Sequence, residues 1–560
     1  MYNVLIGGAA GEGIDTVASV FERALKSSGY HVFTVRDFMS RVRGGHNFTQ
    51  VRFGAERVAT HIDALDGIIA LDQATIDLHI GRLGERGFVL CDASAKTEDP
   101  RAIKLDAVKI ATDLGNPKAA SSVSIGAALK MLGEEASFAA QVMLETMKPS
   151  IVEVNLEALK AGYGLAEARF TRLGTKTGFA GEMLVSGNEC LALGALAGGL
   201  RFYSGYPMSP STSIMAFLEA RALEAQVVVE QAEDEIAAVN MVLGASYAGV
   251  RSLVATSGGG FCLMVEALGF SGIAEIPVVL ADIQRPGPAT GFPTRTEQAD
   301  LKFVISAAQG EFPRMVIALR NHEDAFYQTA RALDIADRYQ IPVILLGDQY
   351  LADATTCVPI FDFDRLPKLS EGEAVLEEED GSGYLRYKLT ESGVSPRLIP
   401  GRSDEIVCID SDEHDERGHI TESASVRIAM VDKRAAKLKG LSAELQEPVF
   451  LGSEGCKTLL VGFGSTWGAI AESVETLNKK EPGGYGALVF GDVWPLPTRE
   501  LTGRARQAER IVNVEQNSTG QLASLVRERT GIVCGESILK YDGRQIRGEE
   551  IVARLQGNGG

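Results

Sequence analysis

Four acidic side chains that could do chemistry gather at the start of a predicted helix: Glu230, Glu233, Asp234 and Glu235. Composition alone favours a structural role, because a helix dipole favours acids at its N-terminus and such acids usually stay in solvent. Glu235, however, is followed by mainly small and apolar residues through position 245, so this helix is expected to pack closely. A carboxylate entering such a helix is expected to be partly buried with a specific partner, which makes Glu235 a candidate functional group.

Arg285 lies just past a predicted strand at 278–282, in a segment rich in proline and glycine. Such a segment stays out of regular structure. Loops at the carboxyl ends of parallel strands are where ligands bind, and an arginine there can hold a carboxylate through two hydrogen bonds. An ion pair within a loop or between subunits is an equally good interpretation of Arg285.

The glycines at 7–13 stand between a predicted strand and a predicted helix, where backbone N–H groups could face an anion. Their order, Gly8-x-x-Gly11-x-Gly13, reverses the dinucleotide fingerprint, so it indicates NAD only weakly. A tight turn made for close packing explains these glycines equally well. Residues 41–46 form a basic glycine loop that could meet a phosphate, although a solvated or interface loop is favoured.

Several motifs with known chemistry do not occur in the sequence. There is no Gly-Asp-Gly of a diphosphate–magnesium site, no nucleotide P-loop, and neither an HExxH nor a GxSxG motif. The seven cysteines are far apart and include no CxxC pair, so no local iron–sulfur or zinc motif exists. His414 and His419, in an acidic loop, are expected to be solvated, and the sequence predicts no metal site in this chain.

The elements that must position these residues alternate between strands and helices, which predicts an α/β fold with mostly parallel sheets. We expect three α/β domains, at 1–175, 181–356 and 451–560, with a charged linker or excursion at 357–450. The main expected strands are 3–6, 32–34, 51–53, 67–71, 88–91, 226–229, 252–256, 278–282, 341–347, 458–461, 486–490, 510–514 and 531–534. Helices are expected at 188–200, 234–249 and 423–438, among others.

The overall composition narrows the function classes. The chain has 560 residues, 45% apolar, and a net charge of −19, which argues against nucleic acid or an anionic membrane as the main partner. No apolar run approaches the length of a membrane span, and the N-terminus lacks the basic region of a signal peptide. With few, scattered cysteines, these features favour the reducing cytoplasm.

Several loops together resemble a known family. Glu235-x-Ala237-Ala238 followed by 256–260 (Thr-Ser-Gly-Gly-Gly) is similar to the pyrimidine-binding domain of thiamine diphosphate enzymes. More narrowly, 205–211 (Gly-Tyr-Pro-Met-Ser-Pro-Ser), 285–298 and 514–522 resemble loops of the 2-oxoacid:ferredoxin oxidoreductases. The first 170 residues resemble the gamma domain that this family often fuses ahead of its alpha subunit, and the match is closest to the 2-oxoglutarate enzymes.

This resemblance implies an order of domains and a partner. The domains would be a gamma-type domain, a thiamine diphosphate pyrimidine-binding domain and a transketolase C-terminal-like domain. Thiamine diphosphate would be shared with a beta subunit that carries its diphosphate, Mg²⁺ and a [4Fe–4S] cluster, in an (alpha-beta)2 heterotetramer. Coenzyme A would be a co-substrate, and ferredoxin would accept the electrons.

The resemblance also assigns roles to residues. Glu235 would be the catalytic glutamate that hydrogen-bonds the aminopyrimidine ring, while Pro207, Ser257 and Gly258 would bind the cofactor. The 2-oxoacid would be held by four residues, Tyr206, Ser209, Arg285 and Thr294. Ser209 stands where the family more often has threonine, and Met208 where it has isoleucine, so the shape of the substrate pocket differs.

The implied reaction is the oxidative decarboxylation of a 2-oxoacid to its acyl-CoA. 2-Oxoglutarate is the favoured substrate, and pyruvate, branched-chain and aryl 2-oxoacids remain open. A different class also remains open, namely a nucleotide- or flavin-binding electron-transfer protein that uses the N-terminal glycine loop. An NAD-linked dehydrogenase is a third possibility, against which the reversed glycine order argues.

Overall fold

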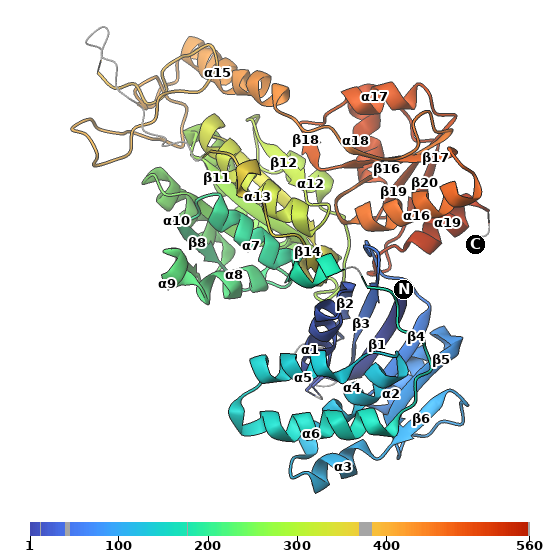
Figure 1. Cartoon of the computed structure of the whole chain (residues 1–560). Coiled ribbons are helices and arrows are strands. Elements are labelled where there is room, and N and C mark those ends of the chain that lie inside the picture. Colours follow the sequence, from blue (N-terminus) through green and yellow to red (C-terminus); the bar gives the residue numbers. More distant parts are fainter. Residues whose placement is uncertain (12, 40–44, 176, 369–382, 558–560) are drawn as a thin grey trace. The chain divides into compact units, whose positions relative to one another are not determined.

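The computed structural model describes residues 1–560 except 12, 40–44, 176, 369–382 and 558–560 (Figure 1). The chain forms two compact units. The first unit consists of Met1–Ser186 with Asp353–Phe361, and the second consists of Gly187–Ala352 with Asp362–Gly560. Both units are built of sheets and helices, so the predicted α/β class is confirmed.

The first unit contains one eight-stranded sheet in the order β6-β5-β4-β1-β3-β2-β14-β7. Strands β6, β5, β4 and β1 are parallel, whereas the remaining neighbours pair antiparallel, so this sheet is mixed. Its strands are β1 (Tyr2–Ala9), β2 (His31–Asp37), β3 (His46–Gly54), β4 (Leu65–Ala70), β5 (Leu83–Asp92), β6 (Ala102–Leu105), β7 (Met183–Ser186) and β14 (Thr355–Val358).

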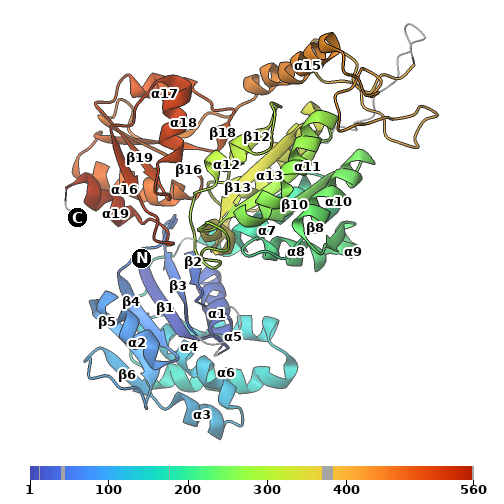
Figure 2. The ribbon, with the colours of Figure 1, turned by 180° about the vertical axis from the view of Figure 1, so that it is seen from behind.

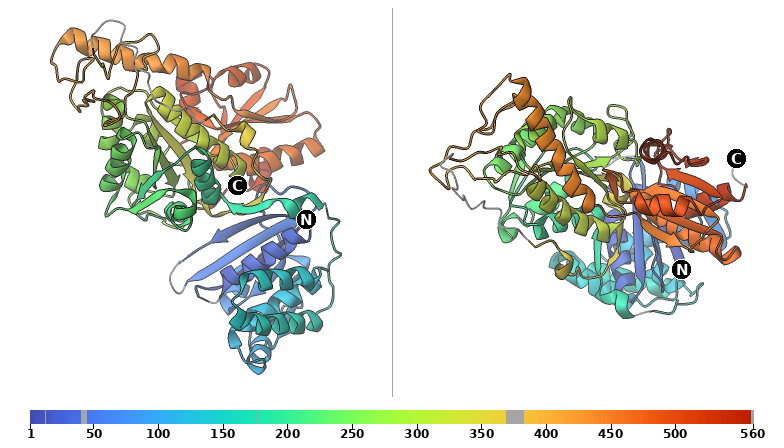
Figure 3. Two further views of the ribbon diagram at one scale, coloured as in Figure 1. Left: turned by 60° about the vertical axis from the view of Figure 1, so that its left-hand side comes forward. Right: turned by 90° about the horizontal axis from the view of Figure 1, so that it is seen from above.

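Helices cover both faces of this first sheet. Alternate residues of β1 point to opposite faces, so Val4 and Ile6 belong to one core cluster and Leu5 to another. The larger cluster is covered by α1 (Ile14–Ser27), α4 (Ala120–Met131), α5 (Ala136–Thr146) and α6 (Pro149–Leu165), as Figure 3 shows. The smaller cluster is covered by α2 (Gln73–His79).

The second unit contains a seven-stranded sheet in the order β18-β12-β13-β11-β10-β8-β9. All neighbours are parallel except β18 and β12. Its strands are β8 (Phe202–Gly205), β9 (Val228–Gln231), β10 (Ser252–Thr256), β11 (Val278–Gln284), β12 (Met315–Ala318), β13 (Pro342–Asp348) and β18 (Asp492–Trp494). The carboxyl ends of six parallel strands therefore lie at one edge, where ligands of α/β proteins bind.

Helices cover both faces of this sheet as well. Figure 1 shows α7 (Gly187–Ala197) and α13 (His322–Tyr339) over one face, and Figure 2 shows α11 (Gly258–Ala274) and α12 (Leu301–Ser306) over the other. A five-stranded sheet of the same unit has the order β15-β17-β16-β19-β20. Its strands are β15 (Val449–Gly452), β16 (Thr458–Phe463), β17 (Tyr485–Phe490), β19 (Arg510–Glu515) and β20 (Glu536–Leu539), and its helices include α16 (Trp467–Lys480) and α18 (Gln521–Thr530).

From Asp362 on, the described part of the charged segment 357–450 belongs to the second unit. Its helix α15 (Ala424–Ala443) matches the predicted one and places two buried lysines against one buried carboxylate. Lys433 Nζ and Lys437 Nζ lie 2.6 and 2.5 Å from the oxygens of Glu275, which is the residue directly after α11. These two ion pairs hold α15 to the end of α11, which covers the seven-stranded sheet.

The same packing corrects one prediction. His414 is fully buried, not solvated, because its ring lies against the ring of Tyr387 with 3.9 Å between the centroids. His414 Nδ1 lies 2.9 Å from the carbonyl oxygen of Asp412, and burial lowers the pKa of this imidazole. His419 is exposed, as predicted.

Most predicted elements are confirmed to within a few residues, with one clear exception. Residues 531–534 are not a strand, because Gly531 ends α18 with a φ of 75° and the strand follows at β20. Among the residues described, no helix combines the length and apolar character that crossing a bilayer requires.

Candidate functional site

The predicted site residues lie on loops and helix starts at the carboxyl edge of the seven-stranded sheet. β8 leads into the loop with Tyr206, Pro207 and Ser209, and β10 leads into Ser257 and Gly258. β9 leads into α10 (Glu235–Tyr247), and β11 leads into Arg285. Because β9, β8, β10 and β11 are neighbours, these four segments meet at one edge.

Glu235 differs from the other acids around it. It is the first residue of α10 and is only 3% exposed, whereas Glu230 and Glu233 are exposed. Asp234 caps the helix, since its carboxylate accepts a hydrogen bond from the Ala237 N–H at 2.7 Å. Glu235 Oε1 is buried and has no hydrogen-bond partner among the described residues. The burial expected from the helix sequence thus applies to this one carboxylate.

The glycine turn at the start of α11 lies against Glu235. A Cβ atom at Gly260 would lie 2.5 Å from Glu235 Oε1 and 2.1 Å from Thr256 Oγ1, so only glycine leaves room for both. Ser257 precedes the helix, is fully buried, and has a hydroxyl without a partner among the described residues. The structure therefore brings Glu235, Ser257 and Gly258 into one small region.

Arg285 lies next to the loop that follows β8. Its Nη1 donates a hydrogen bond to the backbone oxygen of Ser209 at 2.6 Å, and burial lowers the pKa of its guanidinium. In the same loop, Met208 Sδ is 3.8 Å from Thr256 Oγ1, which ties the loop to the end of β10. Arg285 and Ser209, 76 residues apart in sequence, are thus neighbours.

Thr294 is less closely tied to this group. It is half-buried and makes no hydrogen bond to Arg285 or Ser209 within the described residues. The residues just after it are anchored elsewhere, since Gln298 N–H donates to the Gln516 carbonyl at 2.7 Å. Tyr206 is 40% exposed and Pro207 is half-buried. The roles of these residues stay predictions.

Sequence reasoning missed several carboxyl groups at the same edge. Asp282 in β11 is fully buried, and burial followed by the charge of Asp300 raises its pKa well above the ordinary value. Burial also raises the pKa of Asp300 and that of Asp348 to about 6. Burial and then Asp300 raise the pKa of Glu297 to about 7. The sequence did contain one sign of these groups, because Asp282 follows the apolar residues of a predicted strand.

The N-terminal motifs fall in the first unit. Residue 12 of the glycine run and residues 40–44 of the basic loop lie outside the described residues. Gly11 and Gly13 have φ values of 99° and 85°, which glycine adopts readily, between β1 and α1. His46 Nε2 lies 2.9 Å from His79 Nε2, and burial, then Arg82 and His46, lower the pKa of His79 to about 4.

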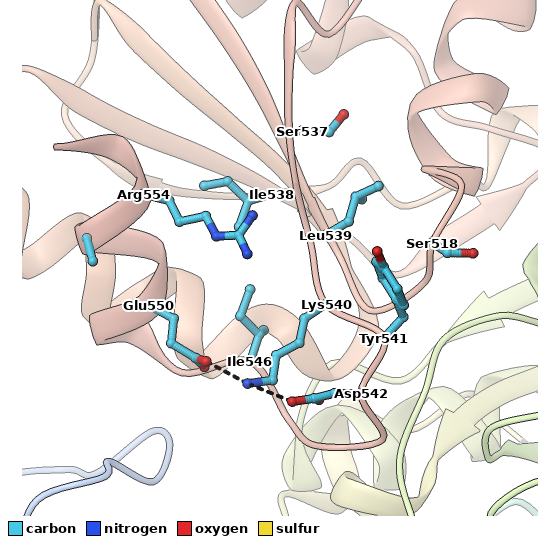
Figure 4. Close-up of a pocket in the computed structure, with 11 residues that line it drawn as sticks. Ser518, Ser537, Ile538, Leu539, Lys540, Tyr541, Asp542, Ile546, Glu550 and Arg554 are labelled. Atoms are coloured by element: carbon cyan, nitrogen blue, oxygen red, sulfur yellow. Dashed lines mark hydrogen bonds and ion pairs between the residues drawn. The ribbon is translucent and has the colours of Figure 1, made fainter. Parts of the chain in front are cut away.

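A separate cavity of about 690 Å³ lies beside the end of β20 (Figure 4). Lys540 Nζ in this cavity is 2.5 Å from a carboxylate oxygen of Glu550 and 3.6 Å from one of Asp542. None of the predicted site residues lines it. Its basic and acidic groups balance, so it offers no charge preference for a ligand.

Comparison with known proteins identifies the family. Residues 193–433 match the family described as pyruvate flavodoxin/ferredoxin oxidoreductase, thiamine diphosphate-binding, and residues 3–165 match the pyruvate ferredoxin/flavodoxin oxidoreductase family. The chain is 31% identical to a 2-oxoacid:ferredoxin oxidoreductase subunit alpha from Sulfolobus, over 98% of this chain and 96% of that protein. It is 28% identical to the 2-oxoglutarate oxidoreductase subunit KorA of Mycobacterium tuberculosis, over 98% and 90% of the two chains.

A solved structure agrees with these sequence relatives. The 2-oxoglutarate:ferredoxin oxidoreductase from Magnetococcus marinus, solved with 2-oxoglutarate, coenzyme A and succinyl-CoA bound, superposes with a TM-score of 0.93 at 27% identity. The match covers 100% of this chain and 99% of that one. The resemblance read from the loops is confirmed: the chain belongs to the 2-oxoacid:ferredoxin oxidoreductase family, among its alpha subunits.

Proposed function

We propose that the chain is the alpha subunit of a thiamine-diphosphate-dependent enzyme that converts 2-oxoglutarate and coenzyme A to succinyl-CoA and CO₂. Electrons would pass to ferredoxin through a beta subunit. The observation that carries the proposal is Glu235 Oε1, a buried carboxylate oxygen without a partner in the described part of the chain, beside the glycine turn of α11. A buried acceptor of this kind costs stability unless a ligand satisfies it.

The residues present fit the aminopyrimidine end of thiamine diphosphate. Glu235 can accept a hydrogen bond from a ring nitrogen, and Gly260 leaves room for the Glu235 carboxylate to lie against the turn at the start of α11. Ser257 and Pro207 stand at the ends of β10 and β8. When bound, the cofactor supplies the nucleophilic carbon that attacks the 2-oxoacid carbonyl.

This chain's own groups would then bind the ring and orient the substrate. Glu235 would accept the hydrogen bond from the ring nitrogen, and its buried position would strengthen that hydrogen bond. Arg285, fixed by the Ser209 carbonyl, keeps its remaining guanidinium N–H groups for the substrate carboxylate. The substrate would also be held by the hydroxyl groups of Ser209 and Thr294 and by Tyr206.

We favour 2-oxoglutarate as the substrate because the relative of known structure holds 2-oxoglutarate and three KorA relatives carry 2-oxoglutarate in their names. Met208, with its flexible side chain beside Thr256, is the residue we expect to tune selection against pyruvate, branched-chain and aryl 2-oxoacids.

The relatives are named as subunits, so the enzyme is a multi-subunit complex. A beta partner would supply the diphosphate site, Mg²⁺ and [4Fe–4S] cluster, since this sequence has no Gly-Asp-Gly motif and no clustered cysteines. We expect an (alpha-beta)2 heterotetramer in the cytoplasm, with no nucleic acid or membrane partner.

The test is co-purification with a candidate beta subunit, followed by a panel of 2-oxoacids with coenzyme A and methyl viologen as electron acceptor. Dye reduction that depends on both subunits and is fastest with 2-oxoglutarate supports the proposal. Faster turnover of pyruvate or a branched-chain 2-oxoacid would overturn the substrate assignment. A flavin spectrum of the chain alone, without 2-oxoacid activity in the complex, would instead favour an electron-transfer protein.

A further inference from the structure

One long loop carries two of the residues assigned to the substrate. The segment 285–299 joins β11 to the start of α12 without regular structure, and it contains Arg285 and Thr294. Its middle part, 287–293, is exposed. Exposed loops are usually mobile, so a binding site on such a loop needs anchors on rigid elements.

The two ends of this loop are joined by the side chain of Gln284, the last residue of β11. Gln284 Oε1 accepts a hydrogen bond from the backbone N–H of Asp300 at 3.0 Å. Gln284 Nε2 donates to the backbone oxygen of Gly347 in β13 at 2.9 Å. The base of the loop is thus tied to the seven-stranded sheet.

Gln298 ties the end of the loop to the five-stranded sheet. Its Nε2 donates to the backbone oxygen of Phe463 at 2.9 Å, and its Oε1 accepts from the backbone N–H of Gln516 at 3.3 Å. Its backbone N–H donates to the backbone oxygen of Gln516 at 2.7 Å, and its backbone oxygen accepts from Asn517 Nδ2 at 3.1 Å. Gln298 is only 1% exposed, and its side chain and its backbone both bind this one region.

The partners of Gln298 stand at the carboxyl ends of two neighbouring strands. Phe463 is the last residue of β16, and Gln516 directly follows β19, which pairs parallel with β16. A Cβ atom at Gly464 would lie 3.0 Å from Gln298 Nε2, and Gly464 has a φ of 57°, which glycine adopts readily. The sheet therefore offers a fixed and closely fitting support for this one side chain.

A second anchor lies between Thr294 and Gln298. Thr296 Oγ1 donates to Asp348 Oδ1 at 3.4 Å and accepts from the backbone N–H of Tyr350 at 3.2 Å. Thr294 is two residues from this anchor and four from Gln298. Its position therefore depends on both attachments.

We propose that Gln298 is a positioning residue, whose side-chain amide holds the loop 285–299 against the five-stranded sheet and so places Thr294 and Arg285 for the 2-oxoacid. The inference rests on the proposed function, because the placing of these two residues matters only if a 2-oxoacid binds there. It also gives a task to the five-stranded sheet, which carries none of the predicted site residues.

The first test is hydrogen exchange of the purified full-length chain, which does not need activity. In Gln298→Ala the amides of 285–299 should exchange about tenfold faster than in wild type, because two side-chain hydrogen bonds that oppose detachment of the loop are lost. The amides of α10 should exchange as in wild type. Gln507→Ala, which changes an exposed glutamine of the same unit, should alter neither segment.

Gln298→Met guards against a variant that simply folds poorly. Methionine keeps the length of the side chain but lacks the amide, so this variant should behave as Gln298→Ala does. Wild-type exchange of the loop in either variant overturns the anchoring. Faster exchange throughout the chain in both variants also overturns it, because Gln298 would then have only a general structural role.

The second test measures kcat and KM of the assembled complex with the 2-oxoacid, coenzyme A and methyl viologen. Both variants should raise the KM for the 2-oxoacid about tenfold and leave kcat within about twofold of wild type, because substrate binding is weakened while Glu235 stays in place. The affinity for thiamine diphosphate should be unchanged for the same reason.

An unchanged KM, or an equal loss of kcat and of thiamine diphosphate affinity, overturns the positioning role. Faster exchange of the loop in variants of a chain whose complex has no 2-oxoacid activity would refute the proposed function and leave the anchoring by Gln298 standing.

Discussion

Replacing Glu235 with glutamine should lower catalytic turnover without lowering the stability of the chain, because of the surroundings of this side chain. The side chain is 3% exposed, and its Oε1 has no partner among the residues described. An unpaired buried acceptor costs about 1–3 kcal/mol, and more when it is charged. Removing the charge therefore relieves a penalty in the free chain, and we expect the free energy of unfolding of E235Q to be unchanged or higher.

The same substitution should be severe for catalysis. A hydrogen bond to a charged group contributes about 1.5–3 kcal/mol, and each ~1.4 kcal/mol corresponds to a factor of about ten. That loss alone is a factor of roughly 10 to 150. A positioned acid–base group contributes about 10²–10⁴-fold, so E235Q should lose between two and four orders of magnitude in kcat.

The assay is 2-oxoacid-dependent reduction of methyl viologen by the complex, with urea unfolding of the alpha chain measured in parallel. Glu233→Gln is the matched control, because Glu233 is exposed two residues earlier and should change neither quantity. Near-normal turnover of E235Q would refute the role of Glu235. A loss of activity that merely accompanies a large loss of stability would refute the reasoning from the unpaired oxygen.

Four further substitutions have defined outcomes. Arg285→Ala should raise the KM for the 2-oxoacid about 10- to 100-fold, because a charged hydrogen-bond donor is lost, and an unchanged KM in steady-state kinetics would contradict this. Glu275→Gln should cost about 3–5 kcal/mol of unfolding free energy near pH 7, since two buried lysines lose their partner. Burial would raise the pKa of Glu275, but Lys437 and Lys433 outweigh it and lower the value from 4.5 to about 2. Because the pKa of Glu275 is lower in the folded chain than in the unfolded one, its ionised carboxylate stabilises the fold fully above about pH 4.5. The difference in unfolding free energy between wild type and Glu275→Gln should therefore shrink as the pH falls from 4.5 towards 2, which denaturant titrations would measure. Gly260→Ala should abolish activity in the methyl viologen assay, because its Cβ would lie 2.5 Å from Glu235 Oε1. A Cβ at Gly244 would have no atom within 4 Å, so Gly244→Ala should add about 0.5–1 kcal/mol to the free energy of unfolding.

Local patterns predicted most elements of the two units. The strand at 252–256 is found with the predicted bounds, and the helix expected at 234–249 is found at Glu235–Tyr247. Both depend on hydrophobic periodicity and turn residues, which act over a few neighbouring positions. The strand predicted at 531–534 was wrong. The apolar residues after Gly531 look like a strand in sequence, but this glycine ends the helix α18.

The sequence by itself determined the α/β class and the family. It also predicted at least partial burial of Glu235, because a helix lined with small and apolar residues packs closely against its neighbours. Only the tertiary structure decided that β14 joins the sheet of the first unit, that Arg285 meets Ser209, and that the Asp300 carboxylate lies against Gly258 in the first turn of α11. These contacts join residues far apart in the chain. They depend on strand order and register, which the pairing of backbone hydrogen bonds across the whole sheet decides and no local periodicity encodes.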